Sequence, residues 1–121
     1  MLQIEFGSIE EQLLSFCQNW LDDLADEKVT GIDSANCYGI KWGYEKVFEV
    51  LQEYLGNKTS PKVHRVKISD CHPIFYKRDD GGYNLEFDIP LNGEISDLTA
   101  EFEFNRKNSK FEVVLHDIHV M

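Results

Sequence analysis

The sequence predicts a single α+β domain, in which an N-terminal helical hairpin packs on one face of an antiparallel β-meander. Apolar residues recur at helical spacing in the first half of the chain and alternate with polar residues in the second half. Pro61 lies where the spacing changes. The length of 121 residues is close to the commonest domain size, so one domain spanning 1–121 is expected.

Two helices are predicted before Pro61. The first covers residues 8–26 and begins with a capping box, in which Ser8 caps the helix and Glu11 reaches back toward it. The second covers residues 42–55 and ends at a Gly-Asn pair that is typical of helix ends. Residues 28–41 contain many turn formers, and either a loop or a short helical turn fits them.

Five antiparallel strands are predicted after Pro61 from the period-2 alternation. Their expected ranges are 63–70, 74–78, 83–91, 97–105 and 110–120. No helix is expected after residue 80. The alternation changes phase in the last strand, which indicates a bulge near His116-Asp117. Residues 1–6 also alternate, and they form either an edge strand or a lead-in to the first helix.

The apolar faces of these helices and strands define the expected core. Its predicted members are Leu13, Phe16, Trp20, Phe48, Leu51, Leu85, Phe87, Phe102, Phe104, Val113 and Leu115. Hydrophobic residues make up 42% of the chain and include eight Phe, which excludes a disordered protein.

The chain is acidic, with a formal net charge of −10 and a sequence pI of about 4.7. Such a protein repels nucleic acid and anionic membranes and attracts basic partners, so neither nucleic acid nor membrane is expected to bind it. We expect no secretory signal, since no basic region followed by an apolar run is present at residues 1–27, and the sequence has no apolar run of membrane-spanning length. Cys17, Cys37 and Cys71 lack a CxxC spacing, which indicates free thiols in a reducing compartment, and we expect a cytoplasmic protein.

The acidic residues are concentrated in residues 79–105, which contain eight of them and neither Lys nor Arg. Pairing of the two strands in this stretch brings Glu86, Asp88, Glu101 and Glu103 onto one solvated surface. Like charges that face one another across a sheet are destabilising, whereas mixed signs stabilise it. This acidic surface therefore either binds something basic or serves only solubility, and the pattern alone leaves both interpretations open.

Two short clusters contain residues that are typical of metal or catalytic sites. His116 and His119 fall on opposite faces of a strand unless a bulge realigns them, and the usual zinc spacings are absent. Cys71 and His72 are adjacent in sequence, whereas a nucleophile and its base normally come from distant positions. No catalytic or phosphate-binding motif is present, so we expect no catalytic residue, no metal and no cofactor.

Three short segments resemble motifs of a little-characterised bacterial domain family. They are Ile89-Pro90-Leu91, Ser96-Asp97-Leu98-Thr99-Ala100-Glu101 and Leu115-His116-Asp117-Ile118-His119-Val120. Members of that family have an "SDLT" entry to a strand and an ending close to "DDLHV", in which His116 here replaces the first Asp. The resemblance implies a cystatin-like or NTF2-like arrangement, with a helix wrapped by an antiparallel sheet. It also implies relatives among small immunity proteins that protect bacteria from toxins of neighbouring cells, and it supplies no catalytic residues.

The charge and the resemblance together predict a non-enzymatic immunity protein that binds and neutralises a basic toxin domain, with a nuclease as the favoured toxin. An acidic surface imitates the phosphates that a nuclease binds and steers association. The predicted contact residues are Asp79, Asp80, Glu86, Asp88, Glu101, Glu103 and Glu112.

The alternative prediction is an NTF2-like small-molecule-binding protein or enzyme, with a cavity between the helices and the sheet. The candidates to line such a cavity are Trp20, Tyr38, Trp42, His64 and His72. An open cavity with polar walls favours this alternative, whereas a space filled by Phe and Leu side chains favours the immunity protein.

Overall fold

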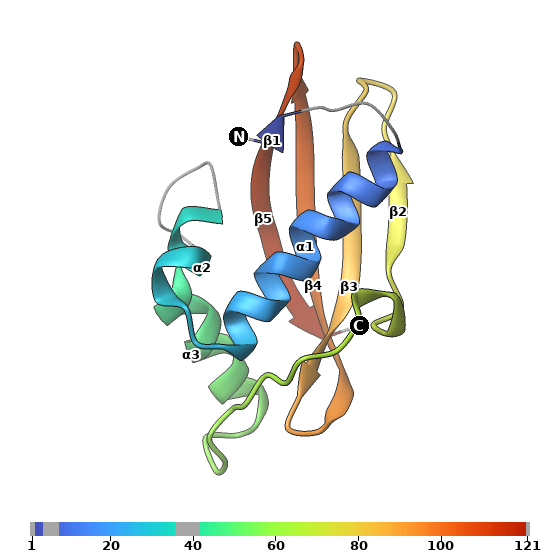
Figure 1. Ribbon diagram of the computed structural model, residues 1–121. Coiled ribbons are helices and arrows are strands. Elements are labelled where there is room, and N and C mark those ends of the chain that lie inside the picture. The colour runs from blue at the N-terminus through green and yellow to red at the C-terminus, as the bar shows by residue number, and fades with distance from the viewer. Residues whose placement is uncertain (1, 4–7, 36–41, 121) are drawn as a thin grey trace.

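A computed structural model describes residues 2–3, 8–35 and 42–120 (Figure 1). The helices are α1 (Ile9–Ala25), α2 (Val29–Ala35), α3 (Tyr44–Tyr54) and the short 3-10 helix η1 (Ile68–Asp70). The strands are β1 (Leu2–Gln3), β2 (Ile74–Lys77), β3 (Tyr83–Leu91), β4 (Glu94–Lys107) and β5 (Lys110–Val120). They form one sheet in the order β1-β5-β4-β3-β2, and every neighbouring pair is antiparallel. The predicted α+β class and the meander from β2 to β5 are confirmed.

Helix α1 crosses one face of the sheet diagonally, with α2 and α3 near its C-terminal end (Figure 1). The predicted N-cap is present, because the backbone N–H of Glu11 donates to the Ser8 hydroxyl at 3.4 Å. The predicted hairpin contains a short third helix in its connection, since α2 lies in the region for which a loop and a helical turn both fitted. No helix in the described ranges is long and apolar enough to cross a membrane.

The predicted strand at 63–70 is wrong. Within it, only Val63 forms a bridge, to Leu91, and the segment ends in η1. The reason is a side chain from α1: the Gln18 amide donates to the Val66 carbonyl at 2.9 Å and accepts from the Ile68 N–H at 2.7 Å. A distant glutamine therefore satisfies backbone groups that a neighbouring strand would otherwise pair.

The remaining strands agree closely with the predictions, although β4 is longer than expected at both ends. Of the lead-in, residues 2–3 form the edge strand β1, whereas residues 1 and 4–6 lie outside the described part. Glu101 pairs with Asp117 while Phe102 pairs with Leu115, so His116 is the extra residue of the predicted bulge. No helix follows residue 80 in the described chain.

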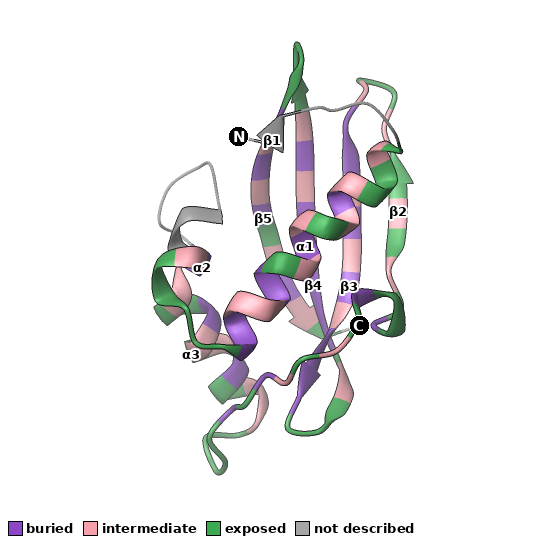
Figure 2. Cartoon of the chain, viewed as in Figure 1, coloured by how far each residue is buried: buried purple, intermediate pink, exposed green. Residues whose placement is uncertain are grey.

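The core lies between α1 and the sheet, where the buried stripe of the helix meets the buried residues of the strands (Figure 2). The Phe102 ring lies at its centre, and its centroid is 5.2 Å from that of Trp20, 6.0 Å from that of Phe87 and 6.3 Å from that of Phe104. Of the predicted core, only Phe16 and Phe48 are half-buried rather than buried. Phe16 still contacts the rings of Phe102 and Phe104, whereas Phe48 stacks on Tyr44.

Phe102→Ala should lower the free energy of unfolding by about 3–5 kcal/mol, because it removes a fully buried ring at the centre of the aromatic cluster. The matched control is Tyr76→Ala, since Tyr76 is 48% exposed and its loss should change stability by about 0.5 kcal/mol or less. Urea titration measures both values. A loss below about 1 kcal/mol for Phe102→Ala would contradict the packing described.

Candidate functional site

The face of the sheet turned away from α1, here called the outer face, carries the polar residues of the strand alternation and lies on the far side in Figure 1. Its members are Ile74, Tyr76, Asn84, Glu86, Asp88, Thr99, Glu101, Glu103, Asn105, Glu112, Val114, Asp117 and His119. Their side chains leave the sheet opposite the buried aromatic residues, as the period of two requires.

Three carboxylates stand side by side across the middle of the outer face. Glu86 pairs with Glu101 across β3 and β4, and Glu101 pairs with Asp117 across β4 and β5. We call Glu86, Glu101 and Asp117 the carboxylate row. Side chains that face one another across adjacent strands have Cβ atoms about 5 Å apart, so the like charges of the row repel.

The pKa of Glu86 is shifted by this repulsion and by burial. Partial burial raises the pKa of Glu86, and the negative charge of Glu101 and a hydrogen bond between the two carboxyl groups raise it further. The nearby His119 acts in the opposite direction. Glu86 thus combines partial desolvation with a neighbouring like charge, which are two conditions that disfavour an ionised carboxyl group.

Asp117 of the row lies 3.2 Å from His119 Nδ1, and carboxylates outside the row also have partners. Asp88 accepts a hydrogen bond from the Thr99 hydroxyl at 3.0 Å and lies 2.8 Å from His72 Nδ1. Glu103 lies 2.7 Å from His116 Nδ1. The four acids that were expected on one surface do share the outer face, but only Glu86 and Glu101 face one another, because Asp88 pairs with Thr99 and Glu103 pairs with Asn84 across the strands.

Arg78 is the functional residue that the sequence reasoning missed. It precedes the acidic stretch by one position, yet its guanidinium group folds back over β3 and β4 to bond Asn84 and Asn105. Its Nη1 atom lies 3.7 Å from a carboxylate oxygen of Glu103. A Cβ atom at Gly82 would lie 2.1 Å from Arg78 Nη2 and 2.8 Å from the backbone carbonyl oxygen of Phe104, so a larger residue there would displace the arginine and press on the β4 backbone. The sequence did contain a signal for this contact, because an arginine directly precedes the acidic hairpin.

The β2–β3 turn contains Asp79 and Asp80, which are both exposed. Asp80 accepts a hydrogen bond from the Gly82 N–H at 2.9 Å and lies 3.2 Å from Arg78 Nε. These contacts, the backbone hydrogen bond first, lower the pKa of Asp80. Asp80 therefore stabilises the turn, although the sequence reasoning grouped it with the partner-binding residues.

The structure brings five of the seven predicted contact residues onto the outer face: Glu86, Asp88, Glu101, Glu103 and Glu112. The Asn105 amide donates to Glu112 at 3.4 Å. The sequence reasoning overlooked Asp117, although the bulge that it predicted is the feature that places Asp117 opposite Glu101.

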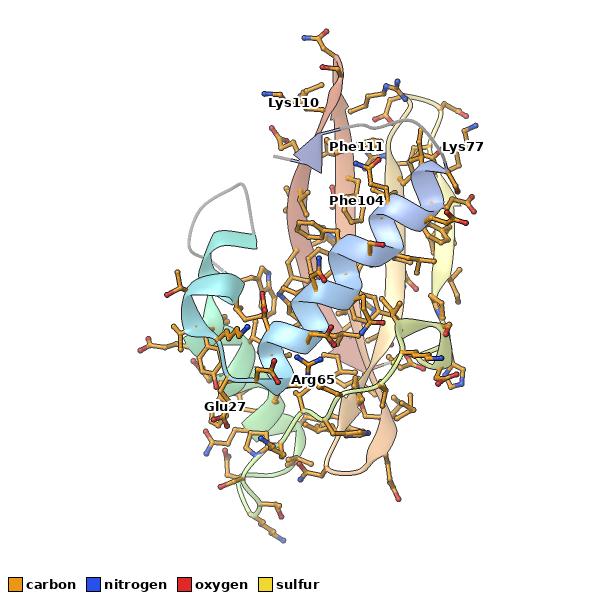
Figure 3. All side chains as sticks on the ribbon, viewed as in Figure 1. Glu27, Arg65, Lys77, Phe104, Lys110 and Phe111 are labelled. Atoms are coloured by element: carbon orange, nitrogen blue, oxygen red, sulfur yellow. The ribbon has the colours of Figure 1, made fainter. Side chains whose placement is uncertain are left out.

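The acidic run at the end of α1 is compensated by a cation. Arg65 forms an ion pair with Asp26 and lies 3.8 Å from Asp22 (Figure 3). The hydrogen bond from Arg65 lowers the pKa of Asp26. This surface therefore differs from the carboxylate row, for which the described residues provide no Lys or Arg ion pair.

The residues proposed to line a ligand cavity do not meet at one site. Trp20 and Trp42 are buried in the core, whereas His64 accepts a hydrogen bond from the Gly93 N–H. His72 is exposed beside Asp88 on the outer face, and Tyr38 lies outside the described residues. Where α1 crosses the sheet, aromatic rings fill the space between them.

The two clusters with catalytic or metal-binding residue types have different surroundings. Cys71 is buried, which together with the charges of Asp70 and Asp88 raises the pKa of its thiol to about 11 and keeps it protonated. His119 Nδ1 lies 3.2 Å from Asp117. The described residues contain no group of three side chains suited to holding a metal ion.

Residues 45–121 match the family model described as a domain of unknown function, DUF7668. The match covers more than half of the chain. This protein belongs to the DUF7668 family. Comparisons with curated proteins and with solved structures each gave no match. The segment matched by the DUF7668 model contains β2 to β5, and hence the whole outer face with its carboxylate row.

Glu86→Gln should raise the free energy of unfolding at pH 7 by about 0.5 kcal/mol, because it removes a charge that is repelled by Glu101. The folded state raises the pKa of Glu86, so its ionisation costs stability above that pKa. This gain should disappear as the pH falls below the ordinary value of 4.5, where Glu86 is protonated in both the folded and the unfolded state.

Urea titrations at pH 7 and pH 4 measure this difference. Glu49→Gln is the control, since it removes the same charge from the exposed side of α3. Equal effects of the two substitutions at both pH values would contradict repulsion within the row.

Proposed function

We propose that this protein is a non-enzymatic immunity protein that binds and neutralises a basic bacterial toxin domain through the outer face of its sheet. The observation that supports the proposal is the carboxylate row, in which Glu86, Glu101 and Asp117 are direct cross-strand neighbours. The resemblance of the C-terminal motifs to those of a family with relatives among immunity proteins points in the same direction. A cytoplasmic location, where such a toxin would act, is part of the proposal.

Solubility alone does not require such a row. A soluble surface is well served by charges of both signs, which stabilise the sheet as cross-strand pairs. This chain has pairs of opposite charge at the end of the same face that lies near the β2–β3 turn, where Arg78 lies beside Glu103 and Asp80. Among the described residues, no Lys or Arg pairs with the carboxylate row, although His119 lies 3.2 Å from Asp117. The repulsion between Glu86 and Glu101 lowers the stability of the free protein.

Binding of a basic partner relieves the repulsion between the carboxylates of the row, and this relief adds to the binding free energy. Cationic side chains placed against the row replace repulsion between carboxylates by attraction, so the bound state gains more than isolated surface charges would provide. The strands hold the carboxylates in fixed positions, which limits the conformational entropy lost on binding. A nuclease is the favoured toxin, because its cleft must be basic to bind phosphates and the row presents negative charges to that cleft.

Glu101→Lys tests this proposal at the centre of the row. The substitution creates an alternating row of Glu86, Lys and Asp117, which should leave stability unchanged or slightly higher. Association with the proposed basic toxin domain should slow by about tenfold at low salt, because the attraction is lost. The difference in association rate between the variant and the unsubstituted protein should shrink above about 0.1 M salt, where the electrostatic screening length falls to roughly 10 Å.

Stopped-flow association kinetics measure these rates, and urea titration establishes that the variant folds. Glu49→Lys on α3 is the matched control, since it changes the net charge equally at a position away from the outer face. If both reversals slow association to the same extent, net charge rather than the row is responsible. If neither does, the outer face is not the binding surface.

A further inference from the structure

Strand β2 forms an open edge of the sheet, since it pairs with β3 and is the last strand in the sheet order. The Arg78 N–H donates to the Gly82 carbonyl at 2.9 Å and closes the β2–β3 turn. In an antiparallel pair, inter-strand bonding alternates from residue to residue. The backbone N–H and C=O groups of Phe75 and Lys77 therefore point away from β3, toward the open edge.

Two large apolar side chains are exposed beside this edge. Ile74 is 46% exposed and Tyr76 is 48% exposed, and both lie on the outer face because they pair with Glu86 and Asn84. A groove of about 210 Å³ adjoins Ile74. Its other walls include His72, Glu86, Asp88, Asp97 and Thr99, so apolar surface and carboxylates meet in one depression.

We propose that β2 accepts an extended, basic segment of the partner protein as an additional strand, whose Arg or Lys side chains enter the adjoining groove. The inference rests on the proposed function and specifies the form of the partner. Main-chain hydrogen bonds to Phe75 and Lys77 supply the pairing, as in other complexes formed by strand addition.

The geometry of an added strand agrees with this occupant. It lies about 4.8 Å beyond β2, and every second side chain projects on the outer face beside Ile74 and Tyr76. A long basic side chain there packs its alkyl part on Ile74 and places its charge near Glu86 and Asp88. Tyr76 provides an aromatic anchor of the type that is enriched in interfaces.

A second copy of this chain is the other possible occupant of an open edge. Pairing of two β2 strands would bring together two chains that each carry a net charge of −10, which repel one another. The charge complementarity therefore favours a basic partner.

The experiment is an NMR titration of the ¹⁵N-labelled full chain at low salt with a six-residue capped peptide that alternates Arg and Val. The largest shifts should occur at the amides of Phe75 and Lys77 and around the groove.

The same peptide with every backbone nitrogen methylated keeps its charge but cannot donate to a strand. Its affinity should fall at least about tenfold. Ile74→Ala should weaken binding of the unmethylated peptide, whereas Val120→Ala removes an exposed apolar group from β5 and should leave it unchanged.

Three results of this titration would contradict strand addition at β2. Shifts centred on Glu101, Asp117 and Glu112, equal for both peptides, would overturn strand addition while leaving binding to the outer face intact. Shifts at β2 that persist with the methylated peptide would also overturn strand addition. A peptide that produces no shifts on either β2 or the outer face would contradict both this inference and the proposed function.

Discussion

The packing of α1 on the sheet determines which face of every strand is buried. Trp20 and Phe16 from the helix contact Phe102 and Phe104, and these strand residues alternate with Glu101 and Glu103. Because side chains on a strand have a period of two, burying the rings forces the carboxylates onto the opposite face. A shift of one residue would bury those carboxylates without partners, so the aromatic core strongly fixes the register.

The acidic surface is thus a consequence of the core, but the absence of a Lys or Arg ion pair beside Glu86, Glu101 and Asp117 among the described residues is a separate property. The same chain neutralises acids elsewhere, with Arg65 beside the end of α1 and Arg78 beside the β2–β3 turn. The bulge at His116 then returns Asp117 to the outer face, opposite Glu101. Without that extra residue, the row would end at β4. The extra residue of the bulge therefore places Asp117 on the surface that we propose binds a partner.

Much of the fold and of the acidic face could be predicted because alternation and capping are local signals. Strand β3, the N-cap at Ser8 and the bulge near His116 were recognisable from neighbouring residues alone. The errors depend on distant contacts. The segment at 63–70 is held by Gln18, which is about 50 residues away, and no local pattern reveals it. Likewise, the pairing of Asp88 with Thr99, and the path of Arg78, required the cross-strand register.

The most direct test of the account is carboxyl footprinting by carbodiimide and mass spectrometry, with the protein free and then bound to the basic partner protein that we propose. The account predicts that Glu86, Glu101 and Asp117 are modified in the free protein and protected in the complex. Asp22 and Asp23, at the end of α1, should react equally in both states. Protection of the α1 acids with an unchanged carboxylate row would contradict it, because the partner would then bind the helical side of the molecule.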